Sequence, residues 1–284
     1  MPFSIKTLTS YNEMLLVHEL QHEIWGVNDP LFALYPPLMN TAAKNGGVVL
    51  GAFDDSTGEM IAFLFGFLGR EGDGPFKLCS QVMGVLPGWR GQGVAEALKQ
   101  AQRRQVIAQE LPLITWTYDP LEAPNAHLNL HKLRGISRTY WEDVYGSDFG
   151  SLNAGLPTDR LVVEWWVNGE RLARRWASTD EPEPVFQVAG RGTARFITRA
   201  RLNLNAPVLE LESLPDLHAV KSASLKLALD WRLHVRTAFQ AYFTRGYIAT
   251  DFLAGTDAAT GERRNRYILR RATPELLAHI GVVR

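Results

Sequence analysis

Apolar side chains near the start of the chain recur at the spacing of one helix face. They are Met14, Val17, Leu20 and Ile24. An apolar residue at every third or fourth position predicts an amphipathic helix. Ser10 and Glu13 have the spacing of a capping box, and Gly26 is typical of a helix end. The pattern therefore predicts a first helix, a turn at residues 28–30 and a short second helix that begins at Pro36.

Short apolar runs bounded by turn residues predict strands along the whole chain. In the first half they cover residues 48–53, 60–68, 78–86, 113–118 and 136–145. In the second half they cover residues 161–167, 194–197, 208–211, 247–253 and 266–269. The polar turn at residues 54–58 joins the first two runs into a hairpin. Pro87 and Gly88 end the third run.

Helical spacing returns in three later segments, at residues 94–111, about 124–133 and 217–242. Strands that alternate with helices predict an α/β fold of the α+β type. A chain of 284 residues exceeds one average domain. This length fits two modest α/β units or one large one. We expect two units, at residues 1–150 and 151–284, the second being a C-terminal α/β extension.

The charge of the chain is balanced. It has 30 Lys and Arg against 30 Asp and Glu, so the formal net charge is zero. Nucleic-acid partners call for clustered positive charge, which this composition does not supply. The most apolar stretch, residues 60–68, is shorter than the roughly 20 residues of a membrane helix. These observations argue against nucleic-acid and membrane partners.

Cysteine usage narrows the compartment. Cys79 is the single cysteine, so no internal disulfide can form and a cysteine-based metal site is disfavoured. Such usage is typical of a reducing environment, and the first ten residues lack the pattern of a secretory signal. We therefore expect a cytoplasmic protein. Cys79 could also act as a nucleophile, but buried packing is the commoner role of a free cysteine.

The sequence Arg90-Gly91-Gln92-Gly93-Val94-Ala95 lies between a predicted strand and a predicted helix. Glycines let the backbone turn tightly there, and amide hydrogens at a helix N-terminus bind anions such as a pyrophosphate. A dinucleotide fingerprint would need a third glycine where Glu96 stands. The Gly-Lys-Ser/Thr sequence of a P-loop is absent. The motif thus predicts a pyrophosphate-bearing ligand that is bound neither by a dinucleotide fingerprint nor by a P-loop.

Over about residues 3–145 the chain resembles the GNAT superfamily of acyl-CoA-dependent N-acyltransferases. The resemblance includes the N-terminal helices, the hairpin, the strand at 78–86, the Arg90-x-x-Gly93-x-Ala95 turn and the helix that ends before Gly135. It implies a mixed twisted sheet flanked by helices. Residues 121–130 and 152–160 resemble a bacterial branch with a C-terminal extension. That extension could be a degenerate second GNAT-like unit, with a role in the acceptor site or in dimerisation.

The resemblance also implies which residues would bind acyl-CoA, the expected co-substrate. Backbone groups of Met83 and Val85 would contact the pantetheine arm, and Asn125 would face it. The turn that would hold the pyrophosphate consists of Arg90, Gly91, Gln92, Gly93, Val94 and Ala95. No metal is expected. His127 and His131 lie four residues apart, as a metal pair can, but the sequence offers no third ligand.

The catalytic candidates come from the same region. Many GNAT enzymes have a tyrosine where this chain has His131, and that tyrosine protonates the departing thiolate; histidine can also donate a proton near neutral pH. Asp119 and Glu122 follow a strand end, where α/β sites gather, and either could be the base. Arg134, Arg138 and Arg160 could bind an acceptor carboxylate, although surface ion pairs are the plainer interpretation.

We therefore expect an N-acyltransferase that moves an acetyl or succinyl group from acyl-CoA to a small amine, with an amino acid as the favoured acceptor. The amine would attack the thioester directly within one ternary complex. A non-catalytic acyl-CoA sensor is the alternative, and the histidine at position 131 favours it. A protein-lysine acetyltransferase is disfavoured because no acidic peptide-docking run is apparent. The sequence leaves a homodimer open.

Overall fold

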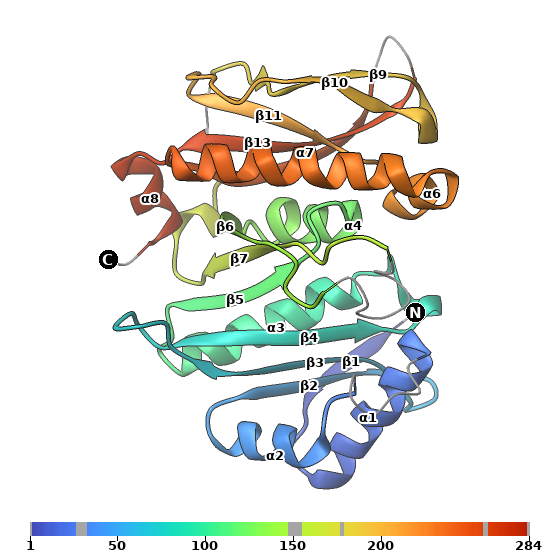
Figure 1. Cartoon of the computed structure of the whole chain (residues 1–284). Helices are drawn as coiled ribbons and strands as arrows, with labels where there is room; N and C mark the ends of the chain where they lie inside the picture. Colours follow the sequence, from blue (N-terminus) through green and yellow to red (C-terminus); the bar gives the residue numbers. More distant parts are fainter. Residues whose placement is uncertain (1, 27–32, 147–154, 177–178, 258–260, 283–284) are drawn as a thin grey trace. The chain divides into compact units, whose positions relative to one another are not determined.

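The computed structural model describes residues 2–26, 33–146, 155–176, 179–257 and 261–282. The turn predicted at residues 28–30 and the start of the 152–160 run lie outside these residues. The chain divides into two compact units (Figure 1). The first comprises Met1–Trp116 with Trp166–Asn168, and the second comprises Thr117–Trp165 with Gly169–Val282. The main segment of the first unit thus ends at residue 116, and the border expected at residue 150 stays a prediction.

The first unit is a mixed sheet with helices on both faces. Its strands lie side by side in the order β1 (Phe3–Thr7), β2 (Val48–Asp54), β3 (Met60–Gly69), β4 (Lys77–Val85) and β5 (Leu113–Tyr118). Neighbours are antiparallel except β4 and β5, which are parallel. The helices are α1 (Tyr11–Trp25), α2 (Pro36–Lys44) and α3 (Val94–Ala108), and the 3₁₀ turn η2 (Pro87–Trp89) precedes α3.

The predicted start and end of α1 are confirmed. The Ser10 and Glu13 side chains form the capping box, and Gly26 takes the left-handed conformation that closes the helix. The apolar face of α1 packs with Met39 of α2 against Val49, Phe53, Phe63 and Phe65 of the sheet. Helix α3 covers the opposite face. Gly66 follows Phe65 in β3 and so faces the other side of the sheet, and a Cβ on Gly66 would contact the side chain of Gln102 in α3.

Helix α3 ends earlier than predicted. The apolar spacing extended to residue 111, but the last helical residue is Ala108. Glu110 has a φ of 57°, and the Leu111 amide donates to the Val106 carbonyl at 3.1 Å. This is the Schellman pattern, which stops a helix before the proline while Leu111 still reaches the core.

The second unit also contains a run of hydrogen-bonded strands. Its strands lie in the order β7 (Arg160–Trp166), β6 (Ile136–Trp141), β12 (Tyr247–Thr256), β13 (Arg263–Arg271), β11 (Val208–Ser213) and β8 (Glu183–Pro184). A separate pair is formed by β9 (Phe186–Ala189) and β10 (Phe196–Ala200). The helices are α4 (Ala123–Ala126), the π-helical turn η3 (His127–Lys132), α6 (Leu217–Ala223), α7 (Leu225–Thr244) and α8 (Pro274–Ile280), with 3₁₀ turns η4 (Glu170–Leu172) and η5 (Gly192–Ala194).

The long helix predicted at residues 217–242 is two helices. Ser224 is extended, with a φ of −160°, and its hydroxyl accepts a hydrogen bond from the Leu227 amide at 3.2 Å. Serine competes with the helix for backbone partners, and here it caps α7 after ending α6. Apolar periodicity does not register such a break. Strand β6 likewise ends at Trp141 instead of residue 145.

The predicted fold class, an α/β chain with a mixed sheet flanked by helices and more α/β structure towards the C-terminus, is confirmed. Within the described residues, no helix has the length and apolar character needed to cross a bilayer.

Candidate functional site

The glycine turn before α3 has the backbone geometry that the sequence predicts. Gly91 and Gly93 have φ values of 76° and 85°, in the left-handed region that other residues rarely adopt. A Cβ at either position would meet no atom within 4 Å. The need for glycine is therefore conformational, and the space above the turn is open.

The amide hydrogens of the first helical turn of α3 have no partner within the helix. Gly93 is the N-cap and offers no side chain to satisfy them. The side chains of the turn bond to preceding carbonyls instead. Gln92 Nε2 donates to Gly88 at 2.7 Å, and Arg90 Nε donates to Val85 at 3.2 Å. The turn thus presents backbone donors at the positive end of a helix dipole, a site suited to a phosphate anion.

Strand β4 leaves part of one edge without a strand partner. It pairs with β5 at Leu78 and Cys79, and no later pairing joins the two strands in the described structure. A register shift in its pairing with β3 makes Gln81 a bulge residue. The segment that follows includes Met83 and Val85. An extended ligand can bond to the backbone of such an edge.

Lys99 marks the place where β4 and β5 part. Its side chain is buried, and Nζ donates to Ser80 Oγ at 2.8 Å and lies 3.6 Å from the centre of the Trp116 ring. Burial lowers the pKa of Lys99 well below its ordinary value. The amine thus links α3 to the first β4 residue beyond the paired segment. Sequence reasoning did not identify it.

A cavity of about 350 Å³ lies in the second unit, next to the residues that follow β5. Charged and polar side chains from the loop between β5 and α4 and from α4, β7, α6 and α7 line it: Asp119, Glu122, Asn125, Arg160, His218 and Arg232. The structure thus brings together four residues that the sequence singled out. His218 and Arg232 were not foreseen.

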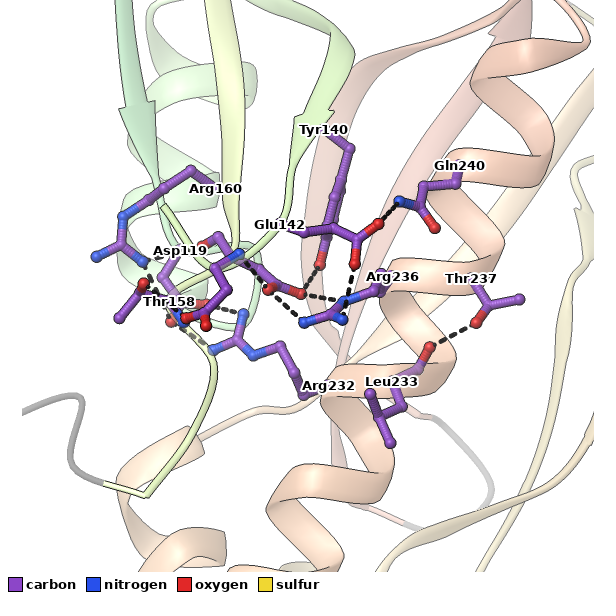
Figure 2. Close-up of polar contacts among 12 residues, drawn as sticks. Asp119, Tyr140, Glu142, Thr158, Arg160, Arg232, Leu233, Arg236, Thr237 and Gln240 are labelled. Carbon is purple, nitrogen blue, oxygen red and sulfur yellow. Dashed lines mark hydrogen bonds and ion pairs between the residues drawn. The ribbon is translucent and has the colours of Figure 1, made fainter. Parts of the chain in front are cut away.

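Asp119 is held by a buried arginine. Arg232 Nη1 and Nη2 contact its two carboxylate oxygens at 2.7 and 2.5 Å (Figure 2). The Leu121 amide also donates to Oδ1 at 2.8 Å, and Arg160 Nη1 lies 3.9 Å from Oδ2. Arg232 is 1% exposed. Both oxygens of Asp119 are therefore engaged by a cation.

Glu122 has a different environment. Its Oε1 lies 3.1 Å from Nε2 of His218, and the two side chains are 27% and 55% exposed. Burial raises the pKa of Glu122, the nearby Asp119 raises it further, and His218 and Arg232 partly offset both effects. A carboxyl group of raised pKa in a cavity is a candidate for proton transfer.

The three candidate arginines have separate surroundings. Arg160 lines the cavity, donates to the Asp159 carbonyl at 2.9 Å and lies over the Tyr145 ring. Arg138 makes two hydrogen bonds to Glu164, at 2.7 and 3.1 Å. Arg134 donates to the carbonyl of Leu172 at 2.9 Å. Of the three, Arg160 alone is among the residues that line this cavity.

His131 lies outside the lining of the cavity. Its Nδ1 is 2.9 Å from Asp251 Oδ1, and its ring stacks on His127 with 4.7 Å between ring centres. Arg175 donates to the His131 carbonyl at 2.8 Å and also pairs with Asp251. Within the described residues, no group of three or more His, Cys, Asp or Glu side chains is placed to hold a metal ion.

A second ion pair fixes the helix that carries Arg232. Arg236, one turn later on α7, donates to both oxygens of the fully buried Asp159 at 2.8 and 2.6 Å. The Tyr140 hydroxyl donates to the same carboxylate at 2.6 Å. In the sequence, the one indication that Arg232 and Arg236 have buried partners is their four-residue spacing in a largely apolar helix.

No protein-family model matches the chain, and no curated protein matches it either. Solved structures do match part of it. A protein from Desulfovibrio desulfuricans, assigned to the GNAT family of acetyltransferases, shares 13% identity with a TM-score of 0.44, over 58% of this chain and 99% of that one. The ribosomal-protein-S18-alanine N-acetyltransferase from Escherichia coli shares 12% identity with a TM-score of 0.45, over 63% and 99%.

A third such structure is the Salmonella typhimurium protein named as an acetyltransferase with its cofactor acetyl-CoA. It shares 14% identity with a TM-score of 0.46, over 63% of this chain and 99% of that one. At these identities and scores the likeness assigns neither an activity nor a substrate. All three structures are named as acetyltransferases.

Proposed function

We propose that this protein is an acyl-CoA-dependent N-acyltransferase that acylates the amine of a small acceptor. The supporting observation is the open glycine turn at the start of α3, in the same unit as the unpaired edge of β4. An extended thioester whose far end carries a pyrophosphate suits both features. Backbone donors serve the anion, and a strand edge serves the amide-bearing arm.

The donor would be bound mainly by main-chain groups. The amides from Gly91 to Ala95 would hold the pyrophosphate, with Arg90 bracing the turn against the end of β4. The backbone of Met83 and Val85 would bond to the pantetheine arm. A β4 amide would then stabilise the charge that develops on the thioester oxygen. The acyl group would be acetyl or succinyl.

The acceptor would occupy the cavity of the second unit. Arg160 is proposed to bind a carboxylate, which makes an amino acid the favoured acceptor. Glu122 is the preferred carboxylate for proton transfer, because both oxygens of Asp119 are engaged by Arg232. Asp119 would therefore position the arginine. Asn125, at the same cavity, would contact the donor or the acceptor.

Acyl transfer would proceed by direct attack. The ammonium group loses one proton to a base, and the amine then forms the C–N bond at the thioester carbon. Collapse of the tetrahedral intermediate breaks the C–S bond, and the nitrogen loses its second proton. The departing thiolate takes up a proton to leave as free CoA. His131, with its ring oriented by Asp251, is the proposed donor of that proton.

The test combines binding and turnover. Purified protein is titrated calorimetrically with acetyl-CoA and succinyl-CoA. CoA release is then measured against the standard L-amino acids and their α-carboxamides. We expect binding, turnover with at least one amino acid, and a loss of rate when its carboxylate becomes an amide. Failure to bind either thioester would refute the proposal.

The second candidate is a non-catalytic acyl-CoA sensor. The engagement of His131 by Asp251 and Arg175 favours it, since those contacts suit a structural histidine. Binding of a thioester without turnover of any acceptor would support this alternative. A cytoplasmic location, as the single cysteine suggests, and a homodimer belong to the proposal and can be checked by fractionation and light scattering.

A further inference from the structure

His218 stands at the cavity without any role assigned by the sequence. It lies in the first turn of α6, two residues after the N-cap Asp216. Its Nε2 is 3.1 Å from Glu122 Oε1, and its side chain is 55% exposed. The imidazole thus lies at ion-pair distance from a carboxylate on one side and remains accessible at the cavity.

We propose that His218 accepts the proton of the acceptor ammonium, with Glu122 as the residue that positions its ring. The inference rests on the proposed acyl-transfer function and names the proton acceptor for that reaction. It replaces a single carboxylate base with a histidine–carboxylate pair assembled from α6 and the N-cap of α4.

The geometry defines the part that each group plays. If Nε2 carries the hydrogen and donates it to Glu122, Nδ1 has the lone pair and can accept a proton. The carboxylate then stabilises the imidazolium that forms, as the third member of a catalytic triad does. One proton moves from nitrogen to Nδ1 before the C–N bond forms. The proton is later returned to solvent, so the step balances.

The charged groups around this pair favour the assignment. Asp119 faces Glu122, but Arg232 engages both of its oxygens. Asp216 also faces Glu122, and its Oδ1 accepts from the Ala219 amide at 2.9 Å as the cap of α6. Among the residues that line the cavity, His218 is the one imidazole. Its partner Glu122 makes no hydrogen bond to an arginine in the described part of the chain.

The test uses full-length protein with acetyl-CoA and the amino acid of the panel that reacts fastest. His218→Ala is expected to lower the acceptor kcat/KM about 100-fold, the usual contribution of a general base. Affinity for acetyl-CoA should stay unchanged. Added imidazole should restore part of the rate, because the position is open to solvent. His218→Asn keeps a hydrogen-bond donor near Glu122 but accepts no proton, so this variant should be as slow as His218→Ala.

His234 provides a matched control. Like His218, it lies near a carboxylate, that of Asp230 on the same helix, at 3.5 Å, but it does not line the cavity. His234→Ala should retain the wild-type rate and pH profile. Wild-type rates for His218→Ala, or wild-type rates for His218→Asn with a slow alanine variant, would overturn the inference and leave the proposed function standing. Absence of wild-type turnover on the whole panel would overturn both.

Discussion

The glycine turn of the first unit and the cavity of the second unit are both suited to a charged ligand, but different groups provide the contacts. The turn is built from main-chain amides, and it requires glycine only for its dihedral angles. The cavity is built from side chains that are charged and paired, with Arg232 buried against Asp119. A backbone site tolerates changes in neighbouring side chains. A side-chain site depends on every partner, because a buried charge without one is costly.

The sharpest way to separate the two regions is to break the buried pair. Arg232→Ala leaves Asp119 without its bidentate partner, and losing one member of such a pair typically costs about 3–5 kcal/mol. We expect a loss of that size in the free energy of unfolding, measured by urea denaturation. The double variant with Asp119→Leu and Arg232→Met should recover most of it. Equal instability of the single and double variants would show that the charge pairing is not the cause.

The corresponding change in the turn should affect binding more than folding. Gly93→Val forces a β-branched residue to a φ of 85° and displaces the amides beside it. Losing one hydrogen bond to a charged phosphate costs about 2 kcal/mol, or roughly 30-fold in Kd for acetyl-CoA by calorimetry. Gly88→Ala is the control, since no atom lies within 4 Å of a Cβ there and its φ is not positive. Equal affinity of both variants would exclude the turn as the anion site.

A smaller effect should distinguish the two carboxylates of the cavity. Because burial raises the pKa of Glu122 above its ordinary value of 4.5, the folded protein holds that proton more tightly than the unfolded chain. Ionisation at neutral pH therefore costs folding free energy, and the cost disappears below pH 4.5. Glu122→Gln should be more stable than wild type at pH 7, with the advantage shrinking as the pH falls towards 4.5.

The same substitution should slow acyl transfer, so stability and turnover would change in opposite directions. Asp119→Asn provides the contrast, because it weakens the pair with Arg232 and should destabilise the protein. Thermal melts across the pH range would check both. A Glu122→Gln variant that is less stable than wild type at pH 7 would contradict the role that burial has here.

The smallest effect is expected outside the cavity. Arg138 makes two bonds to Glu164, but its side chain is 40% exposed. Exposed pairs contribute about 0.5 kcal/mol or less. Arg138→Gln should therefore change the unfolding free energy by no more than this amount and leave the KM for the acceptor unchanged. Arg160→Gln should raise that KM. An equal rise in KM for both variants would move the acceptor site away from the cavity.

Local features of this chain could be predicted from sequence. The capping box at Ser10 and the glycine turn at Gly91 and Gly93 each depend on residues a few positions apart. Strand β5 was predicted to the residue, because an apolar run between Pro112 and Asp119 has few other readings. Breaks that depend on a single competing hydrogen bond, such as that at Ser224, are invisible to apolar periodicity.

The cavity could be predicted only in part. Asp119, Glu122 and Arg160 were selected because they follow a strand end or carry the right charge. Their partners His218 and Arg232 come from far along the chain, and Arg232 is 113 positions from Asp119. A single sequence contains no local pattern that pairs such residues. The same limit explains why the arginines at 134 and 138 could not be told apart from Arg160.

The interruption at Ser224 separates α6, which forms one wall of the cavity, from α7, so that α6 can vary independently of α7. Helix α6 has its own cap at Asp216 and only seven residues, and α7 begins with a fresh cap. Changes of length or sequence in α6 would therefore not shift the register of the arginines on α7. Natural selection, or a laboratory library at residue 217 and residues 219–223 with His218 kept, could change the acceptor preference and leave the arginines of α7 in place.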